Sequence, residues 1–144
     1  MYEKNKAGCM YCDSVCAHRD SLMIHICDFE HSKLYLFRDQ KNRGRCILAF
    51  DGHATDLTDL SKEELDSFMG ELMQVANAIH RGFSPDKINY GSYADTVKHL
   101  HIHVCPKYEG GPNWNGPFSD ANPVYLKDEE YQEIINIFKK ELNK

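Results

Sequence analysis

Three histidines alternate with aliphatic residues over residues 99–104, which read His-Leu-His-Ile-His-Val. Side chains of a β-strand alternate between its two faces, so this spacing predicts that His99, His101 and His103 share one face. Imidazole can serve as a metal ligand, as a general acid or base near neutral pH, or as a nucleophile toward phosphorus. Because neighbouring imidazolium groups repel one another, we expect at least one of the three to be neutral and nucleophilic at pH 7.

A second group of potential ligands lies near the N-terminus, where Cys9 and Cys12 form a Cys-x-x-Cys pair and Cys16 and His18 follow. A thioredoxin-like redox pair would stand at the start of a helix after a strand, and no strand pattern precedes Cys9. Zinc takes four tetrahedral nitrogen or sulfur ligands. The pair therefore favours a metal site, completed either locally by Cys16 and His18 or by histidines from elsewhere in the chain.

The hydrophobic pattern predicts the elements that position these groups. Five segments have the alternation or apolar character of strands, at residues 22–27, 33–38, 45–50, 87–93 and 99–108. A capping box at residues 61–64 begins a helical pattern that runs to Gly82, and a second helical pattern covers about 127–142. This order predicts an α+β fold with a mostly antiparallel sheet of about five strands, a central long helix and a C-terminal helix.

Length and charge exclude several classes of protein. The 144 residues fit one domain spanning residues 1–144, and no repeat or linker divides them. A net charge of -5 without any basic cluster argues against binding to nucleic acid polymers. The sequence has neither a signal peptide nor an apolar run of about 20 residues, which predicts a cytoplasmic protein that does not enter membranes. In that compartment thiols stay reduced, and Cys27, Cys46 and Cys105 are expected to pack as small hydrophobic residues in strands.

The triple-histidine segment, followed by apolar residues, resembles the signature of the histidine triad (HIT) family of nucleotide hydrolases and transferases. Further similarities lie upstream, in the Asn-Tyr-Gly sequence at residues 89–91 and in Thr96, three residues before the first histidine. Asp39, and after it a strand that leads to His53, also resemble the family pattern. The resemblance covers most of residues 9 to 105 and implies a HIT-like fold.

This resemblance implies nucleotidyl transfer at phosphorus. His101, the middle histidine, would attack the α-phosphorus of a purine nucleoside phosphoramidate, an acyl nucleotide or a dinucleoside polyphosphate. The resulting nucleotidyl-histidine would be hydrolysed to a nucleoside monophosphate, which divides one difficult displacement into two easier steps. His103 would contact the phosphate and assist the leaving group. Transferase members carry Gln in place of the third histidine, so His103 favours hydrolysis.

The resemblance also implies substrate contacts. Asn89 and Thr96 would bind phosphate oxygens, and Asp39 would accept hydrogen bonds from ribose hydroxyls. Arg45 stands where many small members carry another histidine; it can bind a phosphate bidentately but cannot exchange a proton at pH 7. Trp114, in the Gly/Pro-rich loop after the triad, is expected to line or cover the nucleotide site at the interface of a homodimer.

Zinc-bearing members of the family imply a metal site made by Cys9, Cys12, His53 and His99. Four protein ligands leave no open position for substrate, so this zinc would be structural. Two alternatives stay open. The chain could be a non-catalytic nucleotide- or metal-binding interaction module, or an enzyme in which the three histidines of the triad hold a catalytic zinc.

Overall fold

One five-stranded sheet organises the computed structural model, which describes residues 1–144, and its strand order is β1-β2-β3-β5-β4. The strands are β1 (Met23–Asp28), β2 (Ser32–Phe37), β3 (Cys46–Phe50), β4 (Lys87–Gly91) and β5 (His101–Lys107). The helices are α1 (Ala17–Leu22), α2 (Lys62–Phe83) and α3 (Asp128–Leu142), with a 3-10 turn η1 (Leu57–Asp59). All neighbouring strands are antiparallel, which confirms the predicted α+β class and sheet.

The structure contains two short helical elements that the sequence pattern does not predict. Helix α1 has six residues and η1 has three, so neither is long enough to display a helical hydrophobic period. Both begin at capping side chains. Cys16 Sγ accepts a hydrogen bond from the backbone N–H of Arg19, and Asp56 accepts one from the backbone N–H of Thr58.

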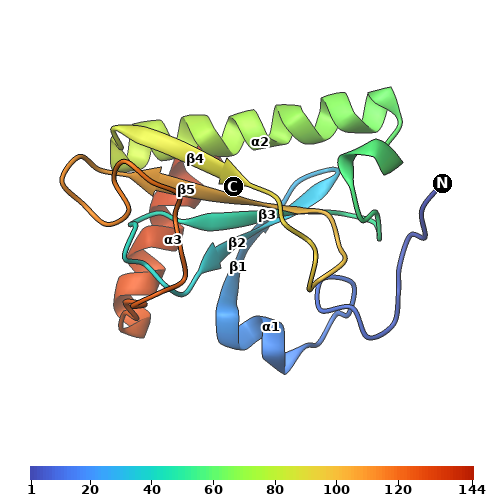
Figure 1. The fold of residues 1–144 in the computed structure, drawn as a ribbon, viewed down its shortest axis with the longest axis horizontal. Coiled ribbons are helices and arrows are strands. Elements are labelled where there is room, and N and C mark those ends of the chain that lie inside the picture. Colours follow the sequence, from blue (N-terminus) through green and yellow to red (C-terminus); the bar gives the residue numbers. More distant parts are fainter.

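The long helix α2 begins and ends as its sequence predicts. The Ser61 hydroxyl accepts from the Glu64 N–H, and the Glu64 carboxylate accepts from the Ser61 N–H. The helix ends at Ser84, which adopts a left-handed conformation with φ of 49°. Helix α2 runs along the sheet, and α3 lies at the opposite end of the molecule from the N-terminus (Figure 1). None of the helices combines the length and apolar character needed to cross a lipid bilayer.

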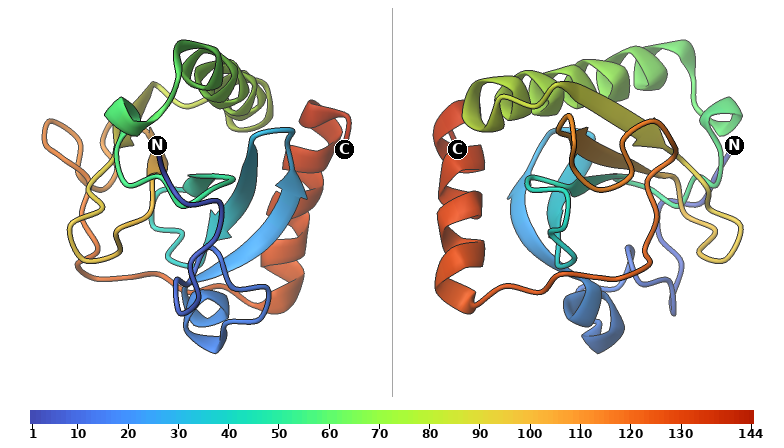
Figure 2. Two further views of the ribbon diagram at one scale, coloured as in Figure 1. Left: turned by 90° about the vertical axis from the view of Figure 1, so that its right-hand side faces the viewer. Right: turned by 60° about the vertical axis from the view of Figure 1, so that its left-hand side comes forward.

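Each face of the sheet buries a different hydrophobic cluster. The larger cluster joins α2 and α3 to the strands and includes Leu100, Ile102 and Val104, the aliphatic residues between the histidines. The smaller cluster lies on the other face and consists of Tyr11, Met23, Tyr35, Ile47 and Ala49. Both views of Figure 2 show the chain between β5 and α3 passing α1 before it reaches α3. Residues of the N-terminal segment, of α1 and of this connection lie near the histidines on this side of the sheet.

Phe68 provides a test of the larger cluster, because it is fully buried on α2 and packs edge-on against Phe50, with 5.4 Å between the ring centroids. We expect Phe68→Ala to lower the free energy of unfolding by about 3–5 kcal/mol, measured by urea denaturation, because it leaves a cavity in the core. Met73→Ala on the same helix is the control, since Met73 is 63% exposed. Equal losses in the two variants would contradict the assigned core.

Candidate active site

The three histidines lie on the face of the sheet opposite α2 and α3. His101 and His103 belong to β5, where they pair with Ala49 and Ile47 of β3, and His99 precedes the strand. The rings of His101 and His103 are 5.3 Å apart between centroids. Tyr11 covers the row, with its ring 5.2 Å from that of His99 and 5.0 Å from that of His101. Strand alternation thus produces the common face that the sequence predicts, on which His99 and His101 are buried and His103 is partly buried.

His101 is held in one tautomer by the backbone. Its Nδ1 lies 2.6 Å from the carbonyl oxygen of His99, so Nδ1 carries the hydrogen and donates it. Nε2 therefore keeps its lone pair. Burial lowers the pKa of His101, which favours the neutral ring. These are the properties that a nucleophilic imidazole requires at neutral pH.

His103 is held in the opposite tautomer. Arg45 Nη2 lies 3.2 Å from His103 Nδ1, and because a guanidinium group can only donate, Nδ1 accepts and Nε2 carries the hydrogen. Burial, with the neighbouring Arg45 charge, lowers the pKa of His103 to about 3. At neutral pH this ring is an uncharged N–H donor. The expectation of at least one neutral imidazole in the triad therefore agrees with the lowered pKa values of both histidines.

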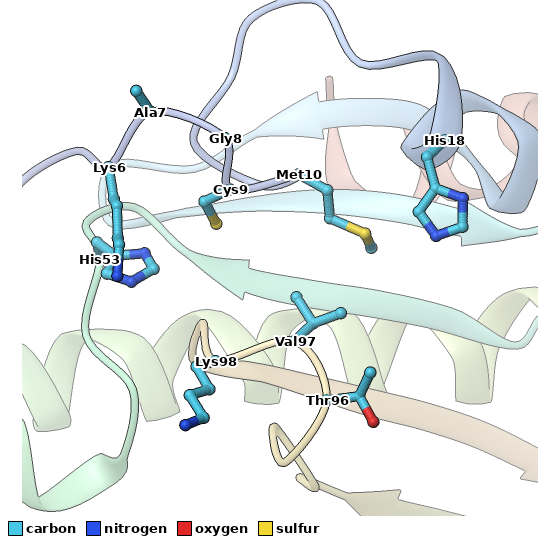
Figure 3. A pocket seen from close by; sticks show the side chains of 10 residues that line it. All are labelled: Lys6, Ala7, Gly8, Cys9, Met10, His18, His53, Thr96, Val97 and Lys98. Atoms are coloured by element: carbon cyan, nitrogen blue, oxygen red, sulfur yellow. The ribbon is translucent and has the colours of Figure 1, made fainter.

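A cavity of about 340 Å³ adjoins the two histidines. One wall is apolar and includes Leu22, Met23, Phe37 and Ile47, while residues 93–97 form another. A neighbouring cavity of about 420 Å³ lies between the N-terminal segment and residues 96–98. Figure 3 shows the side chains that line it. Met10, Thr96 and Val97 line both cavities, so the two cavities are adjacent.

The predicted substrate-binding residues are distributed unevenly around this cavity. Thr96 lies at its rim. Asn89 shares the sheet face of the histidines but pairs with Cys105, and it does not line the cavity. Asp39 is also outside the lining, and its buried carboxylate already accepts hydrogen bonds from Lys41 Nζ at 3.0 Å and from the Val124 N–H at 3.0 Å. The phosphate contact of Asn89 and the ribose contact of Asp39 therefore stay predictions.

The loop after β5 contributes aromatic and acidic groups that sequence reasoning missed. Trp114 does not line the cavity, and its contact with nucleotide stays a prediction. Phe118, four residues later, has its ring centroid 6.0 Å from that of His103. Asp120 lines the cavity and forms an ion pair with Arg45 at 2.9 Å. The only signal in the sequence was the proximity of both residues to the triad within one Gly/Pro-rich segment.

Four side chains converge on a group that could hold a metal ion: Cys9, Cys12, His53 and His99. Their ligand atoms all lie within 4.8 Å of one another, and both sulfurs lie 3.5 Å from His99 Nδ1. A tetrahedral zinc with bonds of about 2.0–2.3 Å places its ligand atoms about 3.3–3.8 Å apart, and the separations of 3.5 Å fall in this range. His99 Nε2 donates to the Phe50 carbonyl at 2.8 Å, which leaves the Nδ1 lone pair directed at the sulfurs.

Two alternative metal sites do not form. Cys16 caps α1, and His18 is exposed, so neither completes a local tetrad with Cys9 and Cys12. The three histidines of the triad do not form such a group of ligand atoms either, and their Nδ1 atoms face different partners. For His99 the partner is a pair of sulfurs, for His101 a carbonyl and for His103 a guanidinium. Because the group of ligand atoms that could hold a metal ion contains His99 but neither His101 nor His103, the structure gives no support to a catalytic zinc held by the three histidines together.

Comparison with known proteins gives consistent matches. The HIT domain family model matches residues 24–110. An uncharacterized HIT-like protein of Mycoplasma genitalium is 29% identical over 138 residues, which cover 92% of this chain and 96% of that protein. A histidine triad protein from Bradyrhizobium japonicum superposes with a TM-score of 0.82 at 22% identity, covering 90% of this chain and 97% of that one. A zinc-bound histidine triad family protein from Mycobacterium smegmatis gives 0.60 at 21% identity, with 84% of each chain covered.

The lowered pKa of His103 makes stability depend on pH. In the unfolded chain this ring takes up a proton below about pH 6.5, whereas in the folded protein it stays neutral down to about 3. Folding is therefore less favourable as the pH falls from 6.5 toward 3, by up to about 1.4 kcal/mol per pH unit for each such proton. We expect His103→Gln to flatten the fall in unfolding free energy between pH 6.5 and 4.5, measured by urea denaturation. The exposed His80→Gln is the control, and an unchanged slope in His103→Gln would refute the assignment.

Proposed function

The chain belongs to the HIT domain family, and from this premise we propose that it is a nucleotide hydrolase with His101 as its nucleophile. The observation that carries the proposal is the 2.6 Å hydrogen bond from His101 Nδ1 to the His99 carbonyl, beside a cavity. This bond leaves Nε2 free to attack. When Nε2 bonds to phosphorus the ring becomes cationic, and the carbonyl dipole at Nδ1 stabilises that charge without rearrangement.

The reaction proceeds in two displacements at one phosphorus atom. His101 Nε2 forms a bond to the α-phosphorus of a purine nucleotide while the bond to the leaving group breaks. Water then attacks the same phosphorus, the bond to Nε2 breaks, and a nucleoside monophosphate is released. The substrate is a nucleoside phosphoramidate, an acyl nucleotide or a dinucleoside polyphosphate. The apolar wall formed by Leu22, Met23 and Phe37 would receive the base.

His103 and Thr96 would stabilise the transferring phosphate. His103 presents a neutral Nε2–H, since Arg45 occupies its Nδ1, and an N–H donor of this kind can bind a phosphate oxygen throughout the reaction. Its low pKa argues against His103 as a proton donor to the leaving group. The Thr96 hydroxyl, at the cavity rim, is a second donor. Contacts of Asn89 and Asp39 with the nucleotide, and assembly of a homodimer with Trp114 at the site, remain part of the proposal without support from the cavity lining.

The metal group is proposed to hold a structural zinc. Two thiolates and two imidazoles are the donor set that zinc prefers, and four of them leave no position for substrate or water. Bound zinc would act as a crosslink. It would join the N-terminal segment to the strand that carries His101, since His99 is both a ligand and the residue whose carbonyl orients His101.

Release of AMP tests the hydrolase. We expect turnover of at least one of adenosine 5'-phosphoramidate, an aminoacyl adenylate analogue and diadenosine tetraphosphate, and a loss of at least about 1,000-fold in kcat for His101→Ala. His25→Ala is the matched control, because His25 is exposed on β1 and does not line the cavity. Nucleotide binding without release of AMP by the wild type would instead favour the non-catalytic binding module.

Metal analysis of the purified protein tests the zinc site. We expect one zinc per chain, and we expect Cys12→Ser to lose the metal and to lower the melting temperature, because structural zinc contributes directly to folding. Cys16→Ser is the control, since Cys16 lies outside the ligand group and should retain the metal. A folded, active wild type without any metal would remove the zinc proposal and leave the role of His101 standing.

A further inference from the structure

Arg45 carries a buried charge that is only partly paired. The residue is 1% exposed, and among its guanidinium nitrogens only Nη2 has polar partners, Asp120 Oδ1 at 2.9 Å and His103 Nδ1 at 3.2 Å. Its Nε and Nη1 are buried without any hydrogen-bond partner. A guanidinium group presents five N–H donors, and a buried cation is stable only when its charge and donors are well matched. The surroundings of Arg45 therefore lack acceptor atoms.

Two aromatic rings hold the guanidinium group in place. Its central carbon lies 4.2 Å from the ring centroid of Phe37 and 4.8 Å from that of Phe118. Stacking between two rings fixes the guanidinium plane and leaves its edge to bind an anion. A positioned Arg edge suits phosphate, whose several oxygens can accept from more than one N–H.

The only carboxylate on Arg45 is loosely held. The Asp120 side chain is 74% exposed, and the ion pair with Arg45 is its one polar contact. Asp120 belongs to the irregular connection between β5 and α3, and Ser119 beside it is also exposed. An ion pair that is open to water on one side contributes little stability, so another anion can replace the carboxylate at small cost.

Space for such an anion lies beside Arg45. A cavity of about 240 Å³ is lined by Arg45, Tyr93, His103, Phe118, Ser119 and Asp120. Tyr93, His103 and Asp120 also line the cavity of His101, so the two cavities are adjacent and His103 borders both. A phosphate bound at Arg45 would therefore be the neighbour of a phosphate at His101.

We propose that this cavity is a second phosphate subsite, which takes the phosphate next to the α-phosphate of the substrate and which Asp120 occupies in the absence of ligand. The inference rests on the proposed function for the position of the α-phosphate. Binding replaces the Asp120 carboxylate on Arg45 Nη2 with a phosphate oxygen, and Asp120 must leave because the two anions repel each other. Arg45 then favours substrates in which a phosphate is the group bonded to the α-phosphate over substrates in which that group is an amine.

The phosphate subsite can be tested by calorimetric titration of the zinc-loaded protein. The ligands are AMP, the α,β-methylene analogue of ADP, and pyrophosphate. Asp120→Asn keeps the shape of the side chain and removes its charge. We therefore expect this variant to bind the two diphosphates about fivefold more tightly, whereas its affinity for AMP should rise less than twofold. Arg45→Lys should abolish the preference for the ADP analogue over AMP. Pyrophosphate reports a free anion, whereas the analogue reports a phosphate attached to a nucleoside.

The matched control is Asp66→Asn, which changes the net charge equally at an exposed ion pair on α2. The subsite would be overturned if Asp66→Asn raised the affinity for diphosphates as much as Asp120→Asn does. It would also be overturned if Asp120→Asn changed the affinities for diphosphates and for AMP equally. The two proposals fail separately. Selective binding of diphosphates without turnover of any substrate would refute the hydrolase alone, while turnover that depends on His101 without selective binding would refute the subsite alone.

Discussion

The antiparallel pairing of β5 with β3 is the constraint on which the candidate site depends. It sets His101 opposite Ala49 and His103 opposite Ile47, so the histidine face of β5 continues into the smaller hydrophobic cluster. Ile102 and Val104, which alternate with the histidines, enter the core beneath α2 and α3. A shift of one residue in register would exchange the two faces and bury the imidazoles among the aliphatic residues of the core. Stability of the core and position of the nucleophile are therefore set by the same hydrogen-bonded ladder.

Three histidines of identical type acquire three different properties from their Nδ1 partners. In His99 this atom faces two sulfurs, and the ring is a candidate metal ligand. In His101 it donates to a carbonyl, which leaves a nucleophilic Nε2. In His103 it accepts from Arg45, which leaves an Nε2–H donor. Burial lowers the pKa of each ring, so hydrogen bonding rather than protonation distinguishes them.

Arg45 contacts both His103 and the carboxylate of Asp120, so it affects the tautomer of the histidine and the binding of anions. Where a histidine could exchange a proton, Arg45 supplies a permanent cation that adds to the effect of burial in keeping His103 neutral and that pairs with Asp120. The same residue is buried with unpaired donors, an arrangement that costs stability unless a ligand completes it. The cation therefore connects the tautomer of His103 with the anion-binding capacity of the neighbouring cavity.

Local patterns in the sequence were sufficient for the strands, the long helix with its capping box, the shared face of the histidines and the Cys-x-x-Cys pair, because each depends on residues a few positions apart. Contacts between distant irregular segments were not predictable. Phe118 and Asp120 lie over His103 while Trp114 does not, and Asp39 is paired with Val124 from the same connection. Such segments have no hydrophobic period that would indicate where they pack. Only the folded chain decides which of their side chains reach the site, because that depends on how the connection from β5 to α3 crosses the sheet.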